Sequence, residues 1–399
     1  MDNYLRNVAS EQYLGFDERK LVAAGAIHTA REISQQPSVW RKIYSVVLAE
    51  QERISRFLKT ALANPEIQII LTGAGSSAFI GCVLEGSFAI RSGRVSRAVA
   101  TTDLLTHPER YVRKSKPVLL VSFARSGNSP ESTAAVDLLK SVCADVYHLV
   151  ITCNAHGSLA TNAANDEKEL VLLLPSETDD KSLVMTSSFT GMLLAGILIS
   201  RIYEIHLLKK DIEILAEYGE RILRVYSSEL EKTAQLNFDR IIFLGSGPLA
   251  GVAEESQLKV QELTDGRVIG KYDTYLGFRH GPKAVINSST LIVYLFSNRD
   301  YVFKYELDLL NDVNAKEKGL SRVGIVEAAG DELDVDLLIR LSDGGVNLDE
   351  DFLAVASVLP AQLLGFFTSL KFDLKPDNPS TNGSITRIVE GVNIYPFLK

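Results

Sequence analysis

The chain has 399 residues, which is too long for one ordinary hydrophobic core and predicts two domains. Its 46% hydrophobic and 23% charged residues are typical of a folded protein and exclude a disordered one. The formal net charge of −8, with six acidic and six basic residues balanced in the first fifty, excludes a basic nucleic-acid-binding module.

The N-terminal region, residues 1–65, is expected to form a helical arm. Thr29 and Glu32 have the spacing of a capping box, in which the two residues satisfy main-chain N–H groups at a helix start. After Pro37 the apolar residues largely follow helical spacing as far as Leu62. These patterns predict helices that lead into the first domain.

Residues 66–210 predict a first α/β domain. The β-branched run at 67–72 enters a glycine-rich turn, and the segment after this turn predicts a helix. Residues 117–123 repeat the pattern and lead into a serine-rich turn and a helix that begins near Pro130. Further strands are expected at residues 146–152 and 169–174. Strands that alternate with helices predict a parallel sheet covered on both faces.

The strand-and-turn pattern returns in the second half of the chain, at residues 240–247 and 290–296. Long helices are expected before it, between about residues 185 and 236, and the apolar run at 191–200 predicts a buried helix. This run is shorter than the roughly 18 to 20 residues that span a bilayer. The repetition predicts a duplicated α/β/α sandwich, with a boundary near residue 210 and a second domain over 211–399.

Cysteine usage and the start of the chain bear on the cellular location. Cys82, Cys143 and Cys153 have neither a disulfide pattern nor metal-binding spacing. The first residues lack the apolar core of a signal peptide. We therefore expect a cytoplasmic protein without a metal site and without a membrane partner.

Two turns carry the residues expected to bind an anion. Ser76 and Ser77 open one predicted helix, and Ser126 and Ser129 precede another. Main-chain N–H groups at helix N-termini bind phosphate, and both turns lie at the carboxyl edge of a parallel sheet. Tight structural turns or a nucleotide fingerprint remain alternatives, although no Gly-Lys-Ser/Thr follows. The second copy continues into Ser297-Asn-Arg-Asp300, so only the first copy is expected to hold phosphate in this way.

A second group of residues could move protons. Glu255, Lys259 and Glu262 share one face of a predicted helix, at i, i+4 and i+7. His280 lies in the loop Arg-His-Gly-Pro. Opening a sugar ring and shifting its C2 proton to C1 needs a carboxylate base and a second acid/base group. On spacing alone, a solvated ion-pair stripe and an ordinary loop histidine are the more common interpretations of these residues.

The chain resembles the sugar isomerase (SIS) domain family over nearly its whole length, as a tandem pair like the isomerase half of glucosamine-6-phosphate synthase. It looks closest to the branch described as galactosamine-6-phosphate deaminase or tagatose-6-phosphate ketose/aldose isomerase. Six segments in order carry the resemblance: Glu32-Ile-Ser-Gln-Gln-Pro37, Gly73-Ala-Gly-Ser-Ser77, Ser126-Gly-Asn-Ser129, Leu258-Lys-Val-Gln-Glu262, His280-Gly-Pro282 and Asp377-Asn-Pro379.

The resemblance implies a role for each matched position. The serines Ser76, Ser77, Ser126 and Ser129 would hold the phosphate and nearby hydroxyls. Glu262 would be the base at C1/C2, Lys259 would lie near the sugar, and His280 would open the ring from a neighbouring subunit. Arg125 stands where the synthase family has glutamine. Further implied pocket residues are Thr186, Ser187 and, at the position of a C-terminal lysine, Ser384, with Arg387 as a less certain equivalent.

The implied function is an isomerising deaminase that converts galactosamine 6-phosphate to tagatose 6-phosphate and ammonia. No cofactor is implied, and the working unit would be a homodimer or higher with a shared site. The synthase carries an N-terminal glutaminase with a cysteine nucleophile, whereas the nearest cysteine here is Cys82, so ammonia from glutamine is not expected. Aldose–ketose isomerisation without deamination is the alternative. A sugar-phosphate sensor without catalysis is a third possibility, although no DNA-binding appendage is evident.

Overall fold

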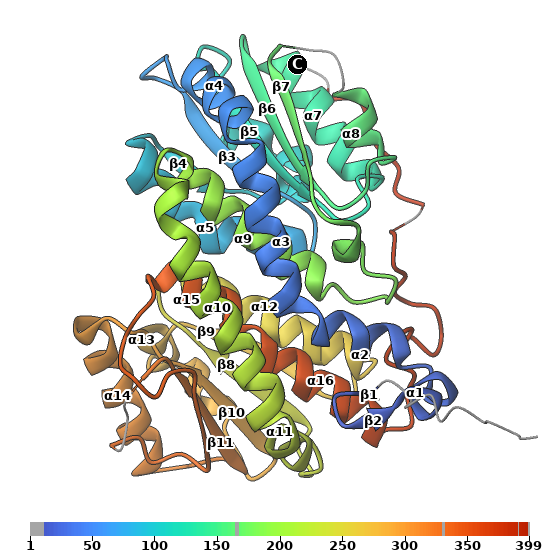
Figure 1. Ribbon diagram of the computed structural model, residues 1–399, viewed down its shortest axis with the longest axis vertical. Helices are drawn as coiled ribbons and strands as arrows, with labels where there is room; N and C mark the ends of the chain where they lie inside the picture. Colours follow the sequence, from blue (N-terminus) through green and yellow to red (C-terminus); the bar gives the residue numbers. More distant parts are fainter. Residues whose placement is uncertain (1–11, 164–166, 329–331, 390, 398–399) are drawn as a thin grey trace, which may run out of the picture.

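The computed structural model describes residues 12–163, 167–328, 332–389 and 391–397. Two five-stranded parallel sheets lie in the upper and lower halves of the molecule in Figure 1. The first sheet has the strand order β4-β3-β5-β6-β7. Its strands are β3 (Gln68–Thr72), β4 (Ser96–Ala98), β5 (Val118–Ala124), β6 (Val146–Thr152) and β7 (Glu169–Leu173). The α/β fold with two parallel sheets is thereby confirmed.

The second sheet repeats this arrangement with the order β12-β11-β10-β8-β9. In each sheet the first strand lies between the second and the third strand in sequence. The order in which the chain adds strands across the sheet therefore reverses beside the first strand. The strands are β8 (Arg240–Leu244), β9 (Ile269–Asp273), β10 (Thr290–Leu295), β11 (Ser321–Val326) and β12 (Leu337–Arg340). The strands β4, β9, β11 and β12 were not predicted from the sequence.

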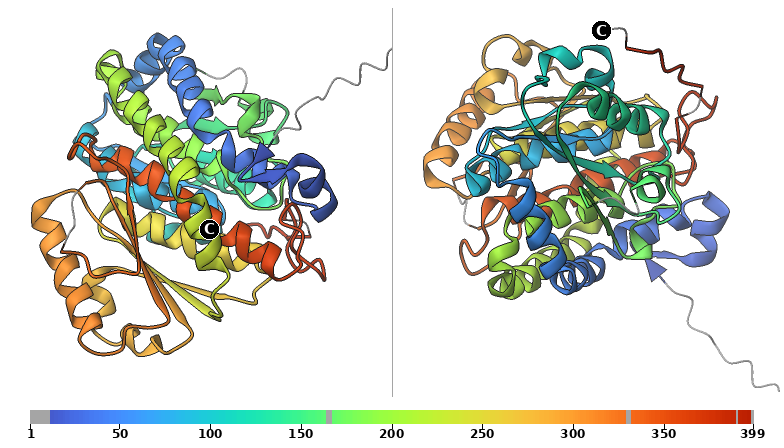
Figure 2. Two further views of the ribbon diagram at one scale, coloured as in Figure 1. Left: turned by 60° about the horizontal axis from the view of Figure 1, so that its bottom comes forward. Right: turned by 90° about the horizontal axis from the view of Figure 1, so that it is seen from above.

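Alternate residues of the central strands face two different apolar clusters. Ile69 and Leu71 of β3 contact a cluster that also includes Ile241 and Phe243 of β8, whereas Ile70 faces a separate cluster on the outer face of the first sheet. The inner faces of both sheets therefore share one continuous core. Figure 2 shows the helices between the sheets: α5 (Ser76–Ser92), α9 (Ser187–Ser200), α12 (Pro248–Leu263), α15 (Glu350–Ser357) and α16 (Leu359–Lys371).

Helices also cover the outer faces and edges of the sheets. In the first domain these are α6 (Thr101–Thr106), α7 (Pro130–Val142) and α8 (Ser158–Asn162), with the short turns η1 (Pro108–Arg110) and η2 (Ser176–Thr178). In the second domain they are α13 (Tyr275–Phe278), η5 (Pro282–Val285) and α14 (Asp300–Asn314). The predicted buried helix at 191–200 is confirmed, because every residue of α9 from Ser187 to Ile199 is buried.

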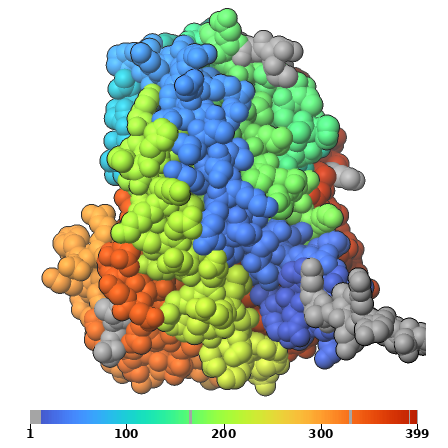
Figure 3. Space-filling view, viewed as in Figure 1, coloured from blue at the N-terminus to red at the C-terminus, as the bar shows by residue number. Residues whose placement is uncertain are grey.

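The N-terminal arm crosses both halves of the molecule (Figure 3). It consists of β1 (Gln12–Tyr13), β2 (Phe16–Asp17), α1 (Glu18–Ala24), α2 (Ile27–Ser34), α3 (Gln36–Ala49) and α4 (Gln51–Ala61). Beside it runs the connection between the domains: η3 (Ile202–Leu208), α10 (Lys209–Arg221), the π-helical turn η4 (Ile222–Tyr226) and α11 (Ser227–Ala234). The helices α3 and α10 pack against each other, so the arm holds the two domains together.

The predicted capping box at Thr29 and Glu32 is wrong. The helix α2 begins two residues earlier, at Ile27, and Thr29 lies inside its first turn. Asp377 caps this helix instead: its carboxylate accepts hydrogen bonds from the main-chain N–H groups of His28 at 3.2 Å and Thr29 at 2.8 Å. The carboxylate of Glu32 is used elsewhere, beside the candidate site.

One candidate membrane span was found among the described residues. The helical segment Glu350–Lys371 is long and apolar enough to cross a bilayer, but 94% of its most apolar window is buried inside the protein. Burial of this kind is typical of a core helix, and α16 packs against α11 and α12.

Candidate active site

Two turns at the carboxyl edge of the first sheet form the predicted phosphate cradle. The strands β3 and β5 are parallel neighbours in which Thr72 pairs with Ser122, so the turns after them lie at the same edge. Gly75 adopts φ 56°, in the left-handed region that favours glycine. A Cβ on Gly73 would lie 2.5 Å from the carbonyl carbon of Ser77. Glycine is therefore required where α5 begins so close to β3.

All four predicted serines lie in these two turns. Ser76 and Ser77 are buried at the start of α5, and Ser129 directly precedes α7. The Ser126 hydroxyl accepts a hydrogen bond from the Asn128 N–H at 3.3 Å, and the Ser129 and Ser132 hydroxyls are 2.6 Å apart. The N-termini of α5 and α7 thus meet at one edge, an arrangement suited to binding an anion.

The helix α12 brings Glu255, Lys259 and Glu262 onto one face. Glu255 and Lys259 are fully buried and the Glu262 side chain is 23% exposed, so the alternative of a solvated ion-pair stripe is wrong. The Lys259 ammonium donates to Glu262 Oε2 at 2.5 Å and lies 3.4 Å from Glu255 Oε1. This Glu–Lys–Glu group places a buried ammonium between two carboxylates on one face of α12.

The groups that affect the pKa of Glu255 on α12 include Ser76 from the first domain. Burial raises the pKa of Glu255 to about 7, while Lys259 and the Ser76 hydroxyl favour its charged form. Burial opposes the charge of Lys259, but Glu255 and Glu262 outweigh that effect and its pKa is raised. Because α12 packs against α5, the start of α5 at Ser76 lies near the charged face of α12.

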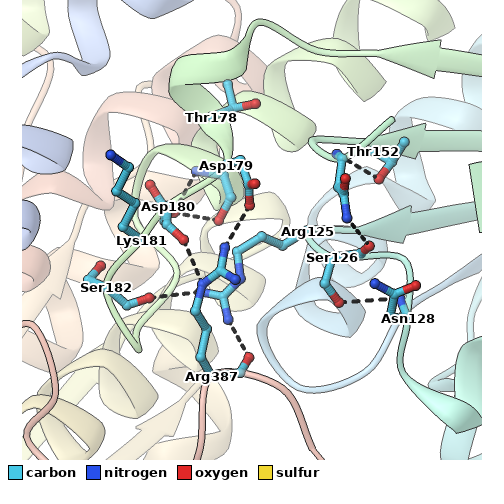
Figure 4. A network of polar contacts seen from close by, with 12 residues as sticks. Arg125, Ser126, Asn128, Thr152, Thr178, Asp179, Asp180, Lys181, Ser182 and Arg387 are labelled. Atoms are coloured by element: carbon cyan, nitrogen blue, oxygen red, sulfur yellow. Dashed lines mark hydrogen bonds and ion pairs between the residues drawn. The ribbon is translucent and has the colours of Figure 1, made fainter. Parts of the chain in front are cut away.

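Arg125 is a buried cation beside the cradle, only 7% exposed (Figure 4). Its guanidinium donates to the carbonyl oxygens of Ser182 at 3.3 Å, Leu183 at 3.0 Å and Arg387 at 2.5 Å. Burial lowers its pKa, and Asp180 and Glu262 are among the charges that oppose this. Within residues 12–163, 167–328, 332–389 and 391–397, none of the ion pairs involves Arg125. Its charge is therefore available to a bound anion.

Arg387 anchors the C-terminal segment to the loop beside Arg125. Its guanidinium donates to the Asp180 carbonyl at 2.8 Å and to Asp179 Oδ1 at 2.7 Å (Figure 4). Ser384, by contrast, is exposed, and its main-chain N–H donates to Asn382 Oδ1 at 2.9 Å. Of these two residues, Arg387 is the one that contacts the loop beside Arg125, so contact of Ser384 with a ligand stays a prediction.

Thr186 and Ser187 lie at the start of α9 and are fully buried. Both hydroxyls donate to Asp180 Oδ1, at 3.2 Å and 2.7 Å, and the Thr186 N–H donates to Asp180 Oδ2 at 2.7 Å. These side chains therefore hold the loop that carries the carbonyl acceptors of Arg125. Their predicted contact with a ligand stays a prediction.

Glu32 and Asp180 are site-supporting residues that the sequence did not reveal. Glu32 Oε1 accepts hydrogen bonds from the Lys181 N–H at 2.5 Å and the Ser182 N–H at 3.3 Å, and its other oxygen accepts from the Ser182 hydroxyl. Burial, reinforced by Asp180, raises the pKa of Glu32 to about 7. The only sequence signal was the position of Glu32 in a segment that matched the family pattern.

His280 lies away from the rest of the candidate site. It follows α13 in an exposed turn, and its main-chain N–H donates to the Gly277 carbonyl at 3.1 Å. The helix α13 lies at the left of the second domain in Figure 1, whereas the C-terminal segment that contacts the Arg125 loop runs up the right side. Within a single chain, His280 therefore does not lie beside Arg125.

Comparison with known proteins gives a consistent result. A family model described as SIS domain matches residues 61–199, which contain the first sheet. D-galactosamine-6-phosphate deaminase AgaS from Shewanella sp. strain ANA-3 is 39% identical over 384 residues, covering 95% of each chain. The solved structure of tagatose-6-phosphate ketose/aldose isomerase from Escherichia coli has a TM-score of 0.87 and 35% identity, covering 94% of this chain and 98% of that chain. An isomerizing glutamine–fructose-6-phosphate aminotransferase from Pyrococcus horikoshii is 24% identical over 88% of this chain and 56% of its own length.

Proposed function

Because the chain belongs to the SIS domain family, in the branch of the D-galactosamine-6-phosphate deaminases AgaS, we propose that it converts D-galactosamine 6-phosphate to tagatose 6-phosphate and ammonia. The single observation that supports this proposal is the close packing of α12, which carries Glu255, Lys259 and Glu262, against α5, which begins at Ser76 and Ser77. In the proposal, the first domain binds the phosphate and α12 supplies the groups that transfer protons.

In the proposed complex the phosphate binds at the N-termini of α5 and α7. The hydroxyls of Ser77, Ser126 and Ser129 complete its shell, and Arg125 supplies a positive charge. Three of the five N–H groups of Arg125 donate to carbonyl oxygens, and the other two have no carbonyl acceptor among the described residues. The sugar chain would then extend toward the face of α12.

Glu262 is the proposed base. As the ring opens, His280 moves a proton between O1 and O5, and the open chain presents an aldehyde at C1. Glu262 then removes the C2 proton while protonated His280 gives a proton to O1, which yields an enolamine. Glu262 returns its proton to C1, and the nitrogen gives up one proton to His280. The resulting C2 imine is hydrolysed by water to the ketose and ammonia. Lys259, which donates to Glu262, keeps this carboxylate charged and oriented.

His280 would come from a second copy of the chain. Its turn is exposed, and it is separated from the Arg125 loop across the second domain. Ile269, Tyr272 and Leu276, which precede it, are large exposed apolar residues of the kind that are buried in a homodimer interface. A dimer of this chain would thus complete two sites, each with residues from both subunits.

The proposed reaction needs no metal or organic cofactor, because every proton transfer is assigned to a side chain. We also propose a cytoplasmic location, which suits a sugar-phosphate enzyme whose cysteines, Cys82, Cys143 and Cys153, are all free.

Ammonia release from D-galactosamine 6-phosphate tests the proposal directly. We expect release by the unmodified chain and a loss of at least about a hundredfold in kcat for Glu262→Gln, because general-base catalysis is worth roughly 10² to 10⁴. Glu254→Gln, a neighbour on the same helix outside the charged face, is the matched control. Full turnover by Glu262→Gln would remove this residue from the mechanism.

The second candidate is aldose–ketose isomerisation without loss of nitrogen. The solved relative from Escherichia coli, at 35% identity, carries that name. Conversion of tagatose 6-phosphate without any ammonia release from the amino sugar would favour this activity.

A further inference from the structure

The second domain retains the backbone architecture of the phosphate cradle. Gly247, before α12, has φ 54° and ψ −128°, and Gly75, before α5, has φ 56° and ψ −131°. The strands β8 and β10 are parallel neighbours, as β3 and β5 are. The N-termini of α12 and α14 therefore meet at the carboxyl edge of the second sheet, in a geometry that binds anions elsewhere.

The second of these turns is shorter than its counterpart. Strand register aligns them, because Ser122 pairs with Thr72 in the first sheet and Tyr294 pairs with Leu244 in the second. The turn before α7 contains Arg125–Ser129, whereas the turn before α14 contains only 297–299. The residues that would correspond to Asn128 and Ser129 are missing from the second copy.

A carboxylate of the chain itself occupies the space between the two turns. The Ser297 N–H donates to Glu306 Oε2 at 2.8 Å. Burial raises the pKa of Glu306 to about 7, and the nearby Ser246 side chain, from the turn before α12, opposes this rise. Glu306 therefore lies between the two turns. Glu306 is fully buried, and its Oε1 has no hydrogen-bond partner among the described residues. A buried orphan oxygen of this kind is costly and calls for an explanation.

The surroundings of the second cradle are acidic. A cleft of about 860 Å³ opens at this edge, lined among others by Gly247, Asn298 and Arg299. Its charged lining comprises the carboxylates of Glu85, Asp349, Glu350 and Asp351 and the guanidinium groups of Arg91 and Arg299. Glu350 also accepts a hydrogen bond from the Ser297 hydroxyl. An incoming phosphate would meet an excess of negative charge.

We propose that Glu306 is a built-in anion that occupies the phosphate position of the second domain. Its Oε2 accepts from the Ser297 N–H, as a phosphate oxygen would, and its Oε1 has no donor among the described residues. The duplicated fold thereby keeps the geometry of two anion sites but binds one external anion per chain. This inference concerns the second domain and holds whichever reaction the first domain supports.

Anion rescue tests the proposal. In a Ser126→Ala/Ser129→Ala background, which disables the first cradle, Glu306→Ala should lose thermal stability. Formate, acetate or inorganic phosphate at about 50 mM should restore it by about 2 °C or more, relative to chloride at equal ionic strength. Glu306→Gln, which fills the space and retains an acceptor for the Ser297 N–H, is the matched control and should show no rescue. The proposal would be overturned if the anions did not raise the thermal stability of Glu306→Ala. It would also be overturned if they raised the stability of the Ser126→Ala/Ser129→Ala parent, Glu306→Ala and Glu306→Gln equally.

Equilibrium dialysis with labelled inorganic phosphate provides a test that does not require Glu306→Ala to fold. The unmodified chain, with Glu306 intact, should bind no more than one phosphate per chain. A second saturable phosphate site in the unmodified chain would show that the second cradle is open and would contradict the proposal.

Discussion

At the scale of single residues, Arg125 is a buried positive charge without an ion-pair partner among the described residues. Arg125 contacts three carbonyl oxygens and no carboxylate in an ion pair within the described ranges. An uncompensated buried cation is expensive, which makes sense where an anion completes the site. The synthase family, by resemblance, has glutamine at this position, so Arg125 adds a positive charge that the synthase pattern lacks.

Replacing Arg125 with glutamine tests this interpretation. Arg125→Gln should raise KM for the sugar phosphate by about tenfold to a hundredfold, because a hydrogen bond to a charged group contributes roughly 1.5 to 3 kcal/mol. The effect on kcat should be smaller. Arg387→Gln, which leaves the Arg125 guanidinium in place, is the control and should change KM less. An unchanged KM in Arg125→Gln would exclude a role in binding phosphate.

The sequence predicted the residues with strong local patterns and missed those that act across the chain. Glu255, Lys259 and Glu262 follow helical spacing, so their common face could be read directly, although their burial could not. Glu32 was taken as part of a local cap because its partners, Lys181 and Ser182, lie about 150 positions away. Contacts over such separations depend on packing that no local pattern encodes.

At the scale of elements, three of the four strands that the sequence did not predict were missed for the same physical reason. The strands β4, β9 and β12 lie at sheet edges, where partial exposure removes the continuous apolar run. The inner strand β11 is fully buried but begins with Ser321 and Arg322, and Arg322 is accommodated by an ion pair with Asp336 at 3.0 Å. Because Arg322 interrupts the apolar run, the hydrophobicity pattern did not predict this strand.

The cap on α2 is a prediction at this scale. Asp377 joins the C-terminal segment to the start of α2, and removing its carboxylate leaves the His28 and Thr29 N–H groups without their acceptor. Asp377→Ala should lower the free energy of unfolding by about 1 to 2 kcal/mol in denaturant titration, and Asp377→Asn should lower it less. Equal stability of Asp377→Ala and the unmodified chain would show that this contact does not hold the segment.

At the scale of the whole molecule, two predicted domains prove to share one core. The helices α5 and α12 cross so closely that a Cβ on Gly251 would lie 2.7 Å from Val83 Cγ2 and 2.9 Å from the Val83 main-chain nitrogen. This contact places the charged face of α12 against the cradle of the first domain. Tandem domains could be predicted from repeated strand-and-turn patterns, but the faces on which they meet depend on side-chain packing and could not.

The central claim is that each site combines Glu262 of one subunit with His280 of another, and mixing two inactive variants tests it most directly. Glu262→Gln and His280→Asn are unfolded together, refolded as a mixture and assayed for ammonia release. Random pairing in a dimer gives hybrids with one intact site, so about a quarter of the unmodified activity should return. Activity that stays at the level of the separate variants, with hybrid dimers present by mass spectrometry, would contradict a shared site.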